Sequence, residues 1–191
     1  MLPRVENRKG LDIGCGEGTN TRRVARTGAS MIGIDPSTRF IELAIASEDN
    51  KDLRIDFQVA SANSLPFEDA SFDFLISTMC LMDIIDLEKA LKEAFRVLKE
   101  EGFLQFSIVH PCFSTPSTRW ILDKEGKPEG LCVGSYFEEG PRLEEWTFNA
   151  IPCEIKRNHE DFKVVHNHRT LSNWFNLLAE TGFVIDKLWE P

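Results

Sequence analysis

The chain is organised around the run Leu11-Asp12-Ile13-Gly14-Cys15-Gly16-Glu17-Gly18. A short apolar strand, expected from Gly10 to Ile13, ends there in glycines that are spaced every second residue. A helix is expected directly afterwards, from Thr19 to Thr27. Glycine adopts backbone dihedrals that other residues avoid, and without a side chain it lets a ligand lie against the main chain. Strand, glycine turn and helix together predict a nucleotide-binding corner.

Strands and helices alternate through the first half of the chain. Four further strands are expected at Ser30 to Asp35, Leu53 to Ala60, Phe72 to Ser77 and Phe103 to Val109. A second helix opens at Pro36-Ser37, and the clearest helix runs near Asp86 to Lys99, where apolar residues repeat at steps of three and four. Strands joined by helices in this way predict a parallel sheet that is covered on both faces.

The regular alternation lapses after the fifth strand. From His110 to about Asn149 the sequence is rich in Pro, Gly, Ser and aromatic residues, which is typical of a lid or a binding segment. One or two β segments are expected between Trp146 and Val165. A last helix, capped by Thr170 or Ser172, is expected to end at Thr181.

The expected fold class is therefore α/β, a doubly wound and mostly parallel sheet of seven strands with a lid inserted after the fifth. Its final strand is expected at Phe183 to Trp189. The 191 residues are expected to form one domain, because domains typically hold about 100 to 200 residues. We expect a cofactor-binding core at residues 10–109, a lid and acceptor segment at 110–168, and a last helix and strand at 169–191.

Composition and charge narrow the classes of partner. The chain has 22 Lys and Arg against 31 Asp and Glu, a net charge of −9 that disfavours nucleic acid. Its 5 cysteines are scattered without a Cys-x-x-Cys pair, which favours reduced thiols and a cytoplasmic location. No apolar run approaches the length that a membrane span requires, and no signal peptide is recognised, so no membrane partner is expected.

Several motifs occur in a recognisable order between residues 10 and 109. They are the glycine run at 11–18, Gly33-Ile34-Asp35-Pro36-Ser37, Leu65-Pro66-Phe67, Ser71-Phe72-Asp73, Ala90-Leu91-Lys92-Glu93, Arg96-Val97-Leu98-Lys99 and Glu101-Gly102. In this order they resemble the class I S-adenosylmethionine (SAM)-dependent methyltransferases, in particular small-molecule enzymes of the methyltransferase type 11 kind. The resemblance implies a Rossmann-like fold, SAM as cofactor and S-adenosylhomocysteine as product.

The resemblance also implies which residues hold the cofactor. The backbone around Gly14, Cys15, Gly16 and Gly18 is expected to meet the methionine part of SAM, while Asp12 orients that loop. The remaining expected cofactor contacts are Asp35 on the ribose hydroxyls, its neighbour Pro36, Ser61 and Ala62 near the adenine, and Ser77, Thr78 and Met79 after the fourth strand. Ser61 departs from the family pattern, which often has an acid at that position.

The residues themselves also bear on the choice of cofactor. A carboxylate such as Asp35 accepts hydrogen bonds from ribose in NAD enzymes as well, so it does not decide alone. Dinucleotide sites use the spacing Gly-x-Gly-x-x-Gly, whereas this chain has Gly-x-Gly-x-Gly, which favours SAM. A Rossmann oxidoreductase remains the first alternative. A non-catalytic SAM-binding module is the second, because little sequence precedes the first strand where relatives carry a helical cap.

Histidines are the candidates for acid and base chemistry on a small-molecule acceptor. His110 follows the fifth strand, at the edge where open α/β sheets bind ligands, and His168 precedes the last helix. A neutral imidazole there can take a proton from the acceptor. No metal is expected, because no ligand set accompanies the histidines. The expected walls of the acceptor pocket are the aromatic residues Phe113, Trp120, Tyr136, Phe137 and Trp146.

Overall fold

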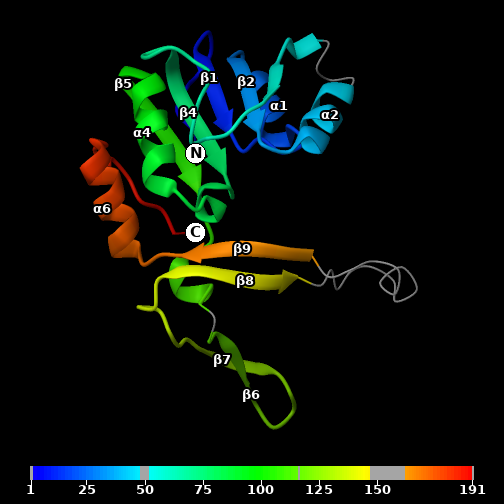
Figure 1. Cartoon of the computed structure of the whole chain (residues 1–191). Coiled ribbons are helices and arrows are strands. Elements are labelled where there is room, and N and C mark those ends of the chain that lie inside the picture. Colours follow the sequence, from blue (N-terminus) through cyan, green and yellow to red (C-terminus); the bar gives the residue numbers. More distant parts are fainter. Residues whose placement is uncertain (1, 48–51, 116, 147–161, 191) are drawn as a thin grey trace. The chain divides into compact units, whose positions relative to one another are not determined.

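The chain divides into two units in the computed structural model, which describes residues 2–47, 52–115, 117–146 and 162–190 (Figure 1). Unit 1 comprises Met1–Val109 and Phe175–Pro191, and unit 2 comprises His110–Trp174. The division after Val109 falls where the regular alternation of strands and helices ends in the sequence. Each unit is described below by itself.

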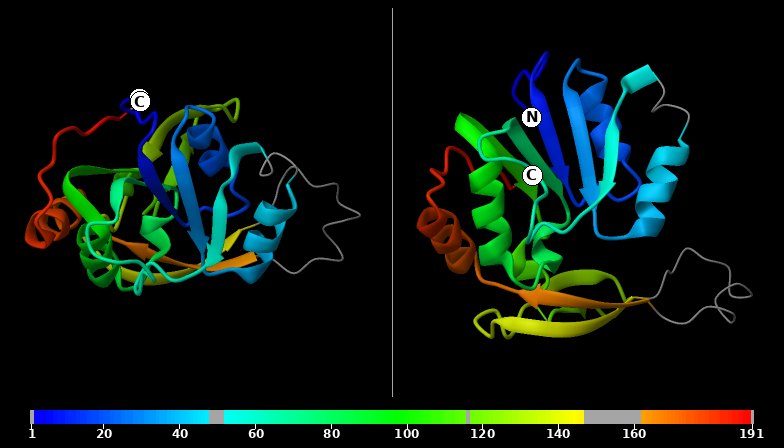
Figure 2. Two further views of the ribbon diagram at one scale, coloured as in Figure 1. Left: turned by 90° about the horizontal axis from the view of Figure 1, so that it is seen from above. Right: turned by 45° about the horizontal axis from the view of Figure 1, so that its top comes forward.

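Unit 1 is built on a parallel sheet with the strand order β3-β2-β1-β4-β5, whose strands lie side by side in Figure 2. The strands are β1 (Lys9–Ile13), β2 (Ser30–Asp35), β3 (Asp56–Val59), β4 (Phe72–Thr78) and β5 (Leu98–Ser107). The helices between them are α1 (Thr19–Ala25), α2 (Thr38–Ala46) and α4 (Leu87–Val97), with a short 3-10 helix η1 (Leu81–Asp83) before α4. From the central strand β1, the chain adds β2 and then β3 on one side of the sheet, and later adds β4 and β5 on the other side. Right-handed crossovers therefore place α1 and α2 on one face of the sheet and α4 on the opposite face.

The central strands form the core because both of their faces are covered. Leu11 of β1 and Phe72, Phe74 and Leu75 of β4 are all 0% exposed. Helix α4 buries one stripe, namely Leu87, Ala90, Leu91, Ala94 and Val97, and its N-terminus is capped by the Asp86 carboxylate, which accepts from Lys89 N. The helix pattern predicted from the sequence for this segment is confirmed.

Arg96 joins α4 to the turn between β3 and β4. Its guanidinium donates to the main-chain oxygens of Leu65 and Phe67, at 3.1 and 2.8 Å, and to the carboxylates of Glu93 and Asp69. These bonds hold the pKa of Glu93 below its usual value, because a cation faces its carboxylate. The Arg96 side chain is only 31% exposed, so these bonds are partly shielded from water.

Replacing Arg96 with alanine is expected to lower the free energy of unfolding by about 2 kcal/mol, since two carbonyls and two carboxylates lose their donor. Urea unfolding followed by circular dichroism measures the change. Lys92 provides the matched control on the same helix, because its ion pair with Glu88 is 62% and 59% exposed and contributes little. Equal loss of stability in Arg96→Ala and Lys92→Ala would contradict the assigned role of Arg96.

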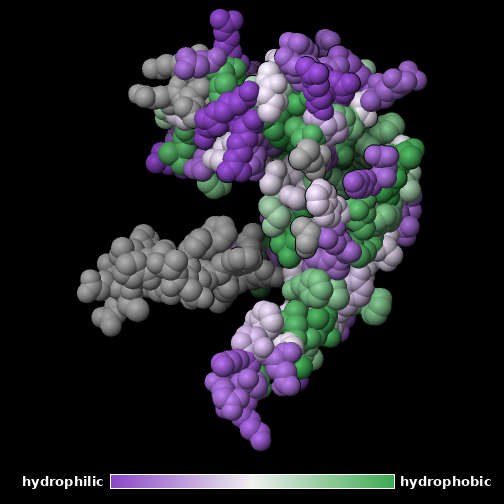
Figure 3. Space-filling view, turned by 180° about the vertical axis from the view of Figure 1, so that it is seen from behind, coloured by the Kyte–Doolittle hydropathy of each residue, from purple (hydrophilic) through white to green (hydrophobic). Residues whose placement is uncertain are grey.

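The expectation of seven strands in one sheet is wrong for the described residues, in which the parallel sheet has five. Residues 183–190 form no strand there; Gly182, in the left-handed region at φ 108°, ends the last helix, and the apolar side chains from Val184 onward are exposed. Val184 is 91% exposed and Trp189 is 65% exposed, so no neighbouring strand covers them. Hydrophobic side chains also reach the surface elsewhere in the space-filling view (Figure 3). The third strand is shorter than expected, because Leu53 and Arg54 lie in a helical turn.

Unit 2 contains two antiparallel pairs in its described residues. Strands β6 (Arg119–Leu122) and β7 (Pro128–Cys132) form one pair, and β8 (Gly140–Trp146) and β9 (Phe162–His168) form the other (Figure 1). A 3-10 helix, η2 (Pro111–Phe113), opens the unit. The β segments predicted between Trp146 and Val165 are thus partly seen, and residues 147–161 lie outside the described part of the chain.

Helix α6 (Leu171–Thr181) follows β9 and continues from unit 2 into unit 1. Thr170 caps it, because its Oγ1 accepts a hydrogen bond from Asn173 N at 3.2 Å. The predicted cap and end of this helix are therefore confirmed. None of the helices in the described ranges has both the length and the apolar character to cross a membrane.

Candidate functional site

The glycine loop between β1 and α1 is held against the end of β2. Gly14, Gly16 and Gly18 all have left-handed φ values, of 72, 54 and 83°. The main-chain nitrogens of Gly14 and Cys15 both donate to Ile34 O at 2.9 Å, and Gly16 N donates to Asp35 Oδ2 at 3.0 Å. The loop is therefore fixed before any ligand arrives.

The glycines differ in what surrounds them. A Cβ on Gly14 would lie 2.1 Å from Cys80 Sγ, and a Cβ on Gly18 would lie 2.5 Å from the Phe57 ring, so both positions are closed by protein atoms. A Cβ on Gly16 would meet nothing within 4 Å. The loop thus presents open main chain to solvent at Gly16, which is what close approach of a ligand requires.

Two buried carboxylates lie beneath this loop. Asp12 is 1% exposed and accepts a hydrogen bond from Thr21 Oγ1 at 2.6 Å, while Asp35 is 9% exposed and accepts from Ser37 N at 2.9 Å through its Oδ1. Burial raises the pKa of Asp12 to about 6, and the nearby Asp35 charge adds to the rise. Two carboxylates in a poorly solvated place favour a ligand that carries positive charge.

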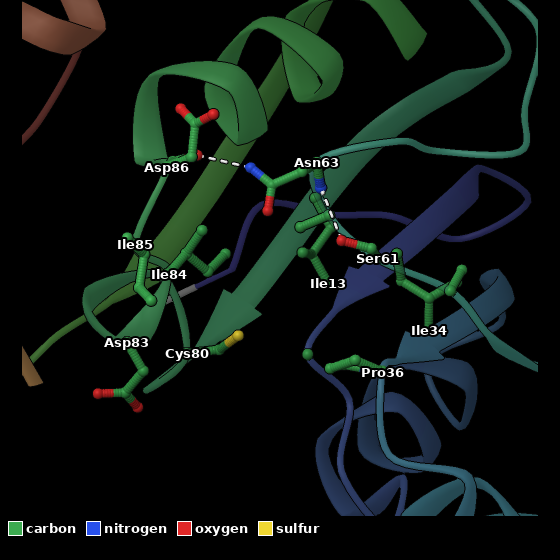
Figure 4. Close-up of a pocket in the computed structure, with 13 residues that line it drawn as sticks. Ile13, Ile34, Pro36, Ser61, Asn63, Cys80, Asp83, Ile84, Ile85 and Asp86 are labelled. Carbon is green, nitrogen blue, oxygen red and sulfur yellow. Dashed lines mark hydrogen bonds between the residues drawn. The ribbon is translucent and has the colours of Figure 1, made fainter. Parts of the chain in front are cut away.

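A cavity of about 360 Å³ opens beside the loop, in unit 1 (Figure 4). Its lining residues come from the carboxyl ends of the strands and the turns that follow them: Ile13, Gly14, Ile34, Pro36, Ala60, Ser61, Ala62, Asn63, Cys80, Asp83, Ile84, Ile85 and Asp86. Open α/β sheets bind their ligands at this edge. The cavity therefore lies at the carboxyl edge of the sheet, next to the glycine loop.

Four of the expected cofactor contacts line this cavity, namely Gly14, Pro36, Ser61 and Ala62. Ser77, Thr78 and Met79 are not among its lining residues. Ser77 is 1% exposed and donates its hydroxyl to Ile13 O at 2.8 Å, so it ties β4 to β1. Thr78 and Met79 are exposed at the end of β4, where Met79 has a φ of 54°.

Sequence reasoning missed the contribution of the segment after β4. Cys80 and the run Asp83 to Asp86 line the cavity, and Asp86 is recognisable from the sequence only as a helix cap. Their position directly after a buried strand is the signal that was available. Burial raises the pKa of Cys80 to about 11 and also raises that of Cys15, so both thiols are protonated at neutral pH and are weak nucleophiles.

His168 lies in unit 2 at the end of β9 and is 1% exposed. Its Nε2 lies 2.8 Å from the main-chain oxygen of Tyr136, which can only accept, so Nε2 carries the proton. In the neutral ring Nδ1 is then a bare acceptor, and within the described residues it is buried without a hydrogen-bond partner. His168 thus presents an unoccupied proton acceptor in a dry place.

His110 is arranged differently. Its Nδ1 accepts a hydrogen bond from Cys112 N at 3.1 Å, which caps η2, and its ring packs on Phe113 at 5.0 Å between ring centroids. The acceptor nitrogen of this ring is therefore already engaged. Of the two predicted bases, the hydrogen bonding favours His168.

The aromatic residues that were expected to wall an acceptor pocket do not form one cluster. Tyr136 packs edge-on against Phe137 and His168, and its hydroxyl accepts a hydrogen bond from Leu171 N at 2.9 Å. Phe113, Trp120 and Phe137 are exposed, by 58%, 65% and 85%. Of Trp146, only the backbone belongs to the described structure. Among the four of these side chains that the structure describes, Tyr136 is the one that has a ring contact with His168.

The parallel sheet, the fixed glycine loop and the carboxylate at the end of β2 define an α/β protein that binds a nucleotide-like cofactor. The methyltransferase domain family matches residues 11–106, which is half of the chain. The chain belongs to this family, and its fold is that of the class I SAM-dependent methyltransferases. Membership of this family favours SAM over NAD as the cofactor.

The chain is similar to several proteins that are named as methyltransferases. The chain is 38% identical over 154 residues to a demethylmenaquinone methyltransferase of Tropheryma whipplei, covering 76% of this chain and 63% of that protein. It is 35% identical over 100 residues to a ubiquinone biosynthesis O-methyltransferase of Pelagibacter ubique, covering 52% and 41%. A crystal structure of a SAM-dependent methyltransferase from Mesorhizobium loti superposes with a TM-score of 0.78 at 28% identity, covering 98% and 79%. The chain thus spans less than two thirds of the length of these two curated relatives.

Replacing Asp12 with asparagine is expected to weaken SAM binding about tenfold at pH 8, because the substitution removes a buried negative charge from beneath the loop that is expected to hold the sulfonium-bearing part of SAM. The wild-type affinity for SAM should rise as the pH increases through about 6, where Asp12 ionises, and the variant should not show this rise. Isothermal titration calorimetry between pH 5 and 8 measures both. S-adenosylhomocysteine, which lacks the sulfonium charge, is the control ligand. Its affinity should change less with pH and with the substitution.

The same substitution has an expected effect on the ligand-free protein. The pKa of Asp12 in the folded state, about 6, lies above the usual aspartate value of 3.8, so between about pH 4 and 6 the folded state binds more protons than the unfolded state. Stability contributed by Asp12 therefore falls as the pH rises through this window. Asp12→Asn should remove that fall and raise the melting temperature at pH 7.5. A lower melting temperature together with unchanged SAM binding would contradict the assignment.

Proposed function

We propose that this protein transfers the methyl group of SAM to a small-molecule acceptor. The observation that carries the proposal is the prepared cofactor site: a glycine loop fixed to Asp35, open main chain at Gly16, and a 360 Å³ cavity next to it. The buried carboxylates Asp12 and Asp35 match a ligand that carries a sulfonium and an ammonium. The family of the chain supports the same reaction.

When bound, SAM supplies a methyl group that its sulfonium already activates, and the electron pair of the broken S–C bond stays on sulfur. The protein contributes orientation and exclusion of water. In this proposal Asp12, Gly14, Cys15, Gly16 and Gly18 hold the methionine part. Asp35 and Pro36 hold the ribose, while Ser61 and Ala62 border the base. Ser77, Thr78 and Met79 shape the end of β4 beside the loop.

The proton that the acceptor loses needs a destination, and we assign it to His168 Nδ1. A buried acceptor atom without a donor destabilises a fold by about 1–3 kcal/mol, so a hydroxyl or an acidic C–H group of a substrate that binds there removes an unfavourable term. The Tyr136 carbonyl fixes the tautomer in which Nδ1 is unprotonated. His110 remains a second candidate.

Small molecules are the acceptor class that the observations favour. The relatives named above act, by their names, on demethylmenaquinone or in ubiquinone biosynthesis. A net charge of −9 disfavours nucleic acids as acceptors. Unit 2 also contains Arg169, a buried cation that is 8% exposed and lies 5.9 Å from the Trp174 ring. The scattered cysteines support a reducing, cytoplasmic location.

Two measurements on the full chain test the proposal. Isothermal titration calorimetry should show binding of S-adenosylhomocysteine and no comparable binding of NAD. Incubation with SAM carrying a radiolabelled methyl group, together with phenols, quinols and small amines, should then label at least one acceptor. Binding without transfer to any compound would favour a non-catalytic SAM-binding module, and failure to bind S-adenosylhomocysteine would overturn the proposed function.

A further inference from the structure

The base-recognising end of the cavity is organised differently from the sequence expectation, which centred on Ser61. The Ser61 hydroxyl accepts a hydrogen bond from Asn63 N at 3.2 Å, and Ser61 O accepts from Ser64 N at 3.1 Å. Both groups of Ser61 therefore stabilise the turn to which Ser61 belongs. This turn presents the side chain of Asn63 at the cavity.

The Asn63 side chain is held in one orientation. Its Nδ2 donates to the main-chain oxygen of Asp86 at 2.6 Å, across 23 positions in the sequence. An amide whose nitrogen is fixed in this way must turn its oxygen to the other side, and in Figure 4 the Asn63 oxygen points away from Asp86 into the space between Ile84 and Ile13. The cavity thus has an oriented hydrogen-bond acceptor at one end.

The walls on either side of this acceptor are apolar. Ile34 and Pro36 lie on one side of the view in Figure 4, and Ile84 and Ile85 lie on the other. Such walls suit a flat ring, and an acceptor between them suits a ring that carries an exocyclic amino group. The adenine of the cofactor has such a group at its 6-position.

We propose that Asn63 Oδ1 accepts a hydrogen bond from the 6-amino group of adenine, so that Asn63 selects the base of the cofactor. This inference rests on the proposed function, because it requires the adenosyl group in the cavity. Ser61 has a supporting role, since its hydroxyl shapes the turn that carries Asn63. Asp86 positions the amide through its main-chain oxygen and needs no particular side chain for this purpose.

A double-mutant cycle with two ligands tests the hydrogen bond directly. The ligands are S-adenosylhomocysteine and its 6-deamino analogue, in which hydrogen replaces the amino group. The wild type should bind the first about tenfold more tightly, which corresponds to about 1.4 kcal/mol. In Asn63→Ala the ratio of the two dissociation constants should fall towards one. Asn63→Asp loses the bond to Asp86 O but keeps an acceptor oxygen, so it should retain a preference for the amino compound.

The outcomes distinguish recognition of the adenine amino group by Asn63 from a purely structural role of Asn63. If Asn63→Ala binds both ligands more weakly and keeps the wild-type ratio, Asn63 only joins the two turns and the inference is overturned. Thermal unfolding of the ligand-free variants shows whether the loss is one of stability. If the wild type itself binds neither ligand, the proposed function fails together with this inference, whereas tight binding with a ratio near one overturns the inference alone.

Discussion

Gly16→Ala is expected to weaken binding of S-adenosylhomocysteine about 100-fold, which corresponds to about 2.8 kcal/mol. Gly16 N already donates to Asp35 Oδ2, and an alanine keeps that bond, so the loss comes from the added methyl group. This methyl would stand in the open space where a ligand meets the main chain. Isothermal titration calorimetry on the full chain measures the change.

Gly126→Ala is the matched control for this substitution. Gly126 also has a left-handed φ, of 79°, and a Cβ there also meets nothing within 4 Å, but it lies in the β6–β7 turn of unit 2. Both variants should lose about 1–2 kcal/mol of stability from backbone strain. Only Gly16→Ala should lose affinity. Unchanged affinity in Gly16→Ala would show that the cofactor does not occupy the space at this glycine.

Gly14 contrasts with Gly16, because its lack of a side chain is needed for packing against Cys80. Its Cβ would overlap Cys80 Sγ at 2.1 Å, so an alanine there displaces the turn after β4 as well as any ligand. The spacing of the glycines in the sequence predicts a turn at both positions, but only the structure separates Gly14, which packs against Cys80, from Gly16, which has open space beside it.

The sequence predicted unit 1 well because local and long-range signals agree there. The buried stripe of α4 and the apolar run of β4 each indicate one kind of element. Asn63 and Asp86 had no such signal, since their contact joins residues 23 positions apart and depends on how two turns meet. A hydrogen bond of this kind follows from the fold and not from local sequence pattern.

The expected final strand shows where pattern alone misleads. Phe183 to Trp189 contains the apolar residues of a strand, but a strand needs a partner for its main chain. In the structure Phe183 N donates to Leu178 O and closes the end of α6, while the Phe183 ring packs on Phe95 at 5.1 Å between ring centroids. These contacts make Phe183 part of the end of α6, so it does not begin a strand. The end of the helix at Gly182 was predicted correctly, and the strand after it was not.

Two substitutions of His168 are expected to lower the rate of methyl transfer about 100-fold, the smaller end of the range for loss of a general base. His168→Gln places an amide N–H where Nε2 donates to Tyr136 O, so it keeps that bond and removes the acceptor nitrogen. His168→Asn places an amide oxygen near the position of Nδ1, so it keeps an acceptor that cannot take up a proton. Single-turnover transfer to the acceptor found in the labelling screen measures both rates.

Together, His168→Gln and His168→Asn distinguish a general base at Nδ1 from a hydrogen-bond acceptor that takes up no proton. If Nδ1 takes the proton, both variants lose activity. If Nδ1 only positions the substrate, His168→Asn should retain most of the rate while His168→Gln does not. Affinity for S-adenosylhomocysteine should stay unchanged in both, because the cofactor cavity is lined by residues of unit 1 alone. Full activity in His168→Gln would exclude His168 as the base and leave His110 as the candidate. The Nδ1 of His110 would first have to release its hydrogen bond from Cys112 N.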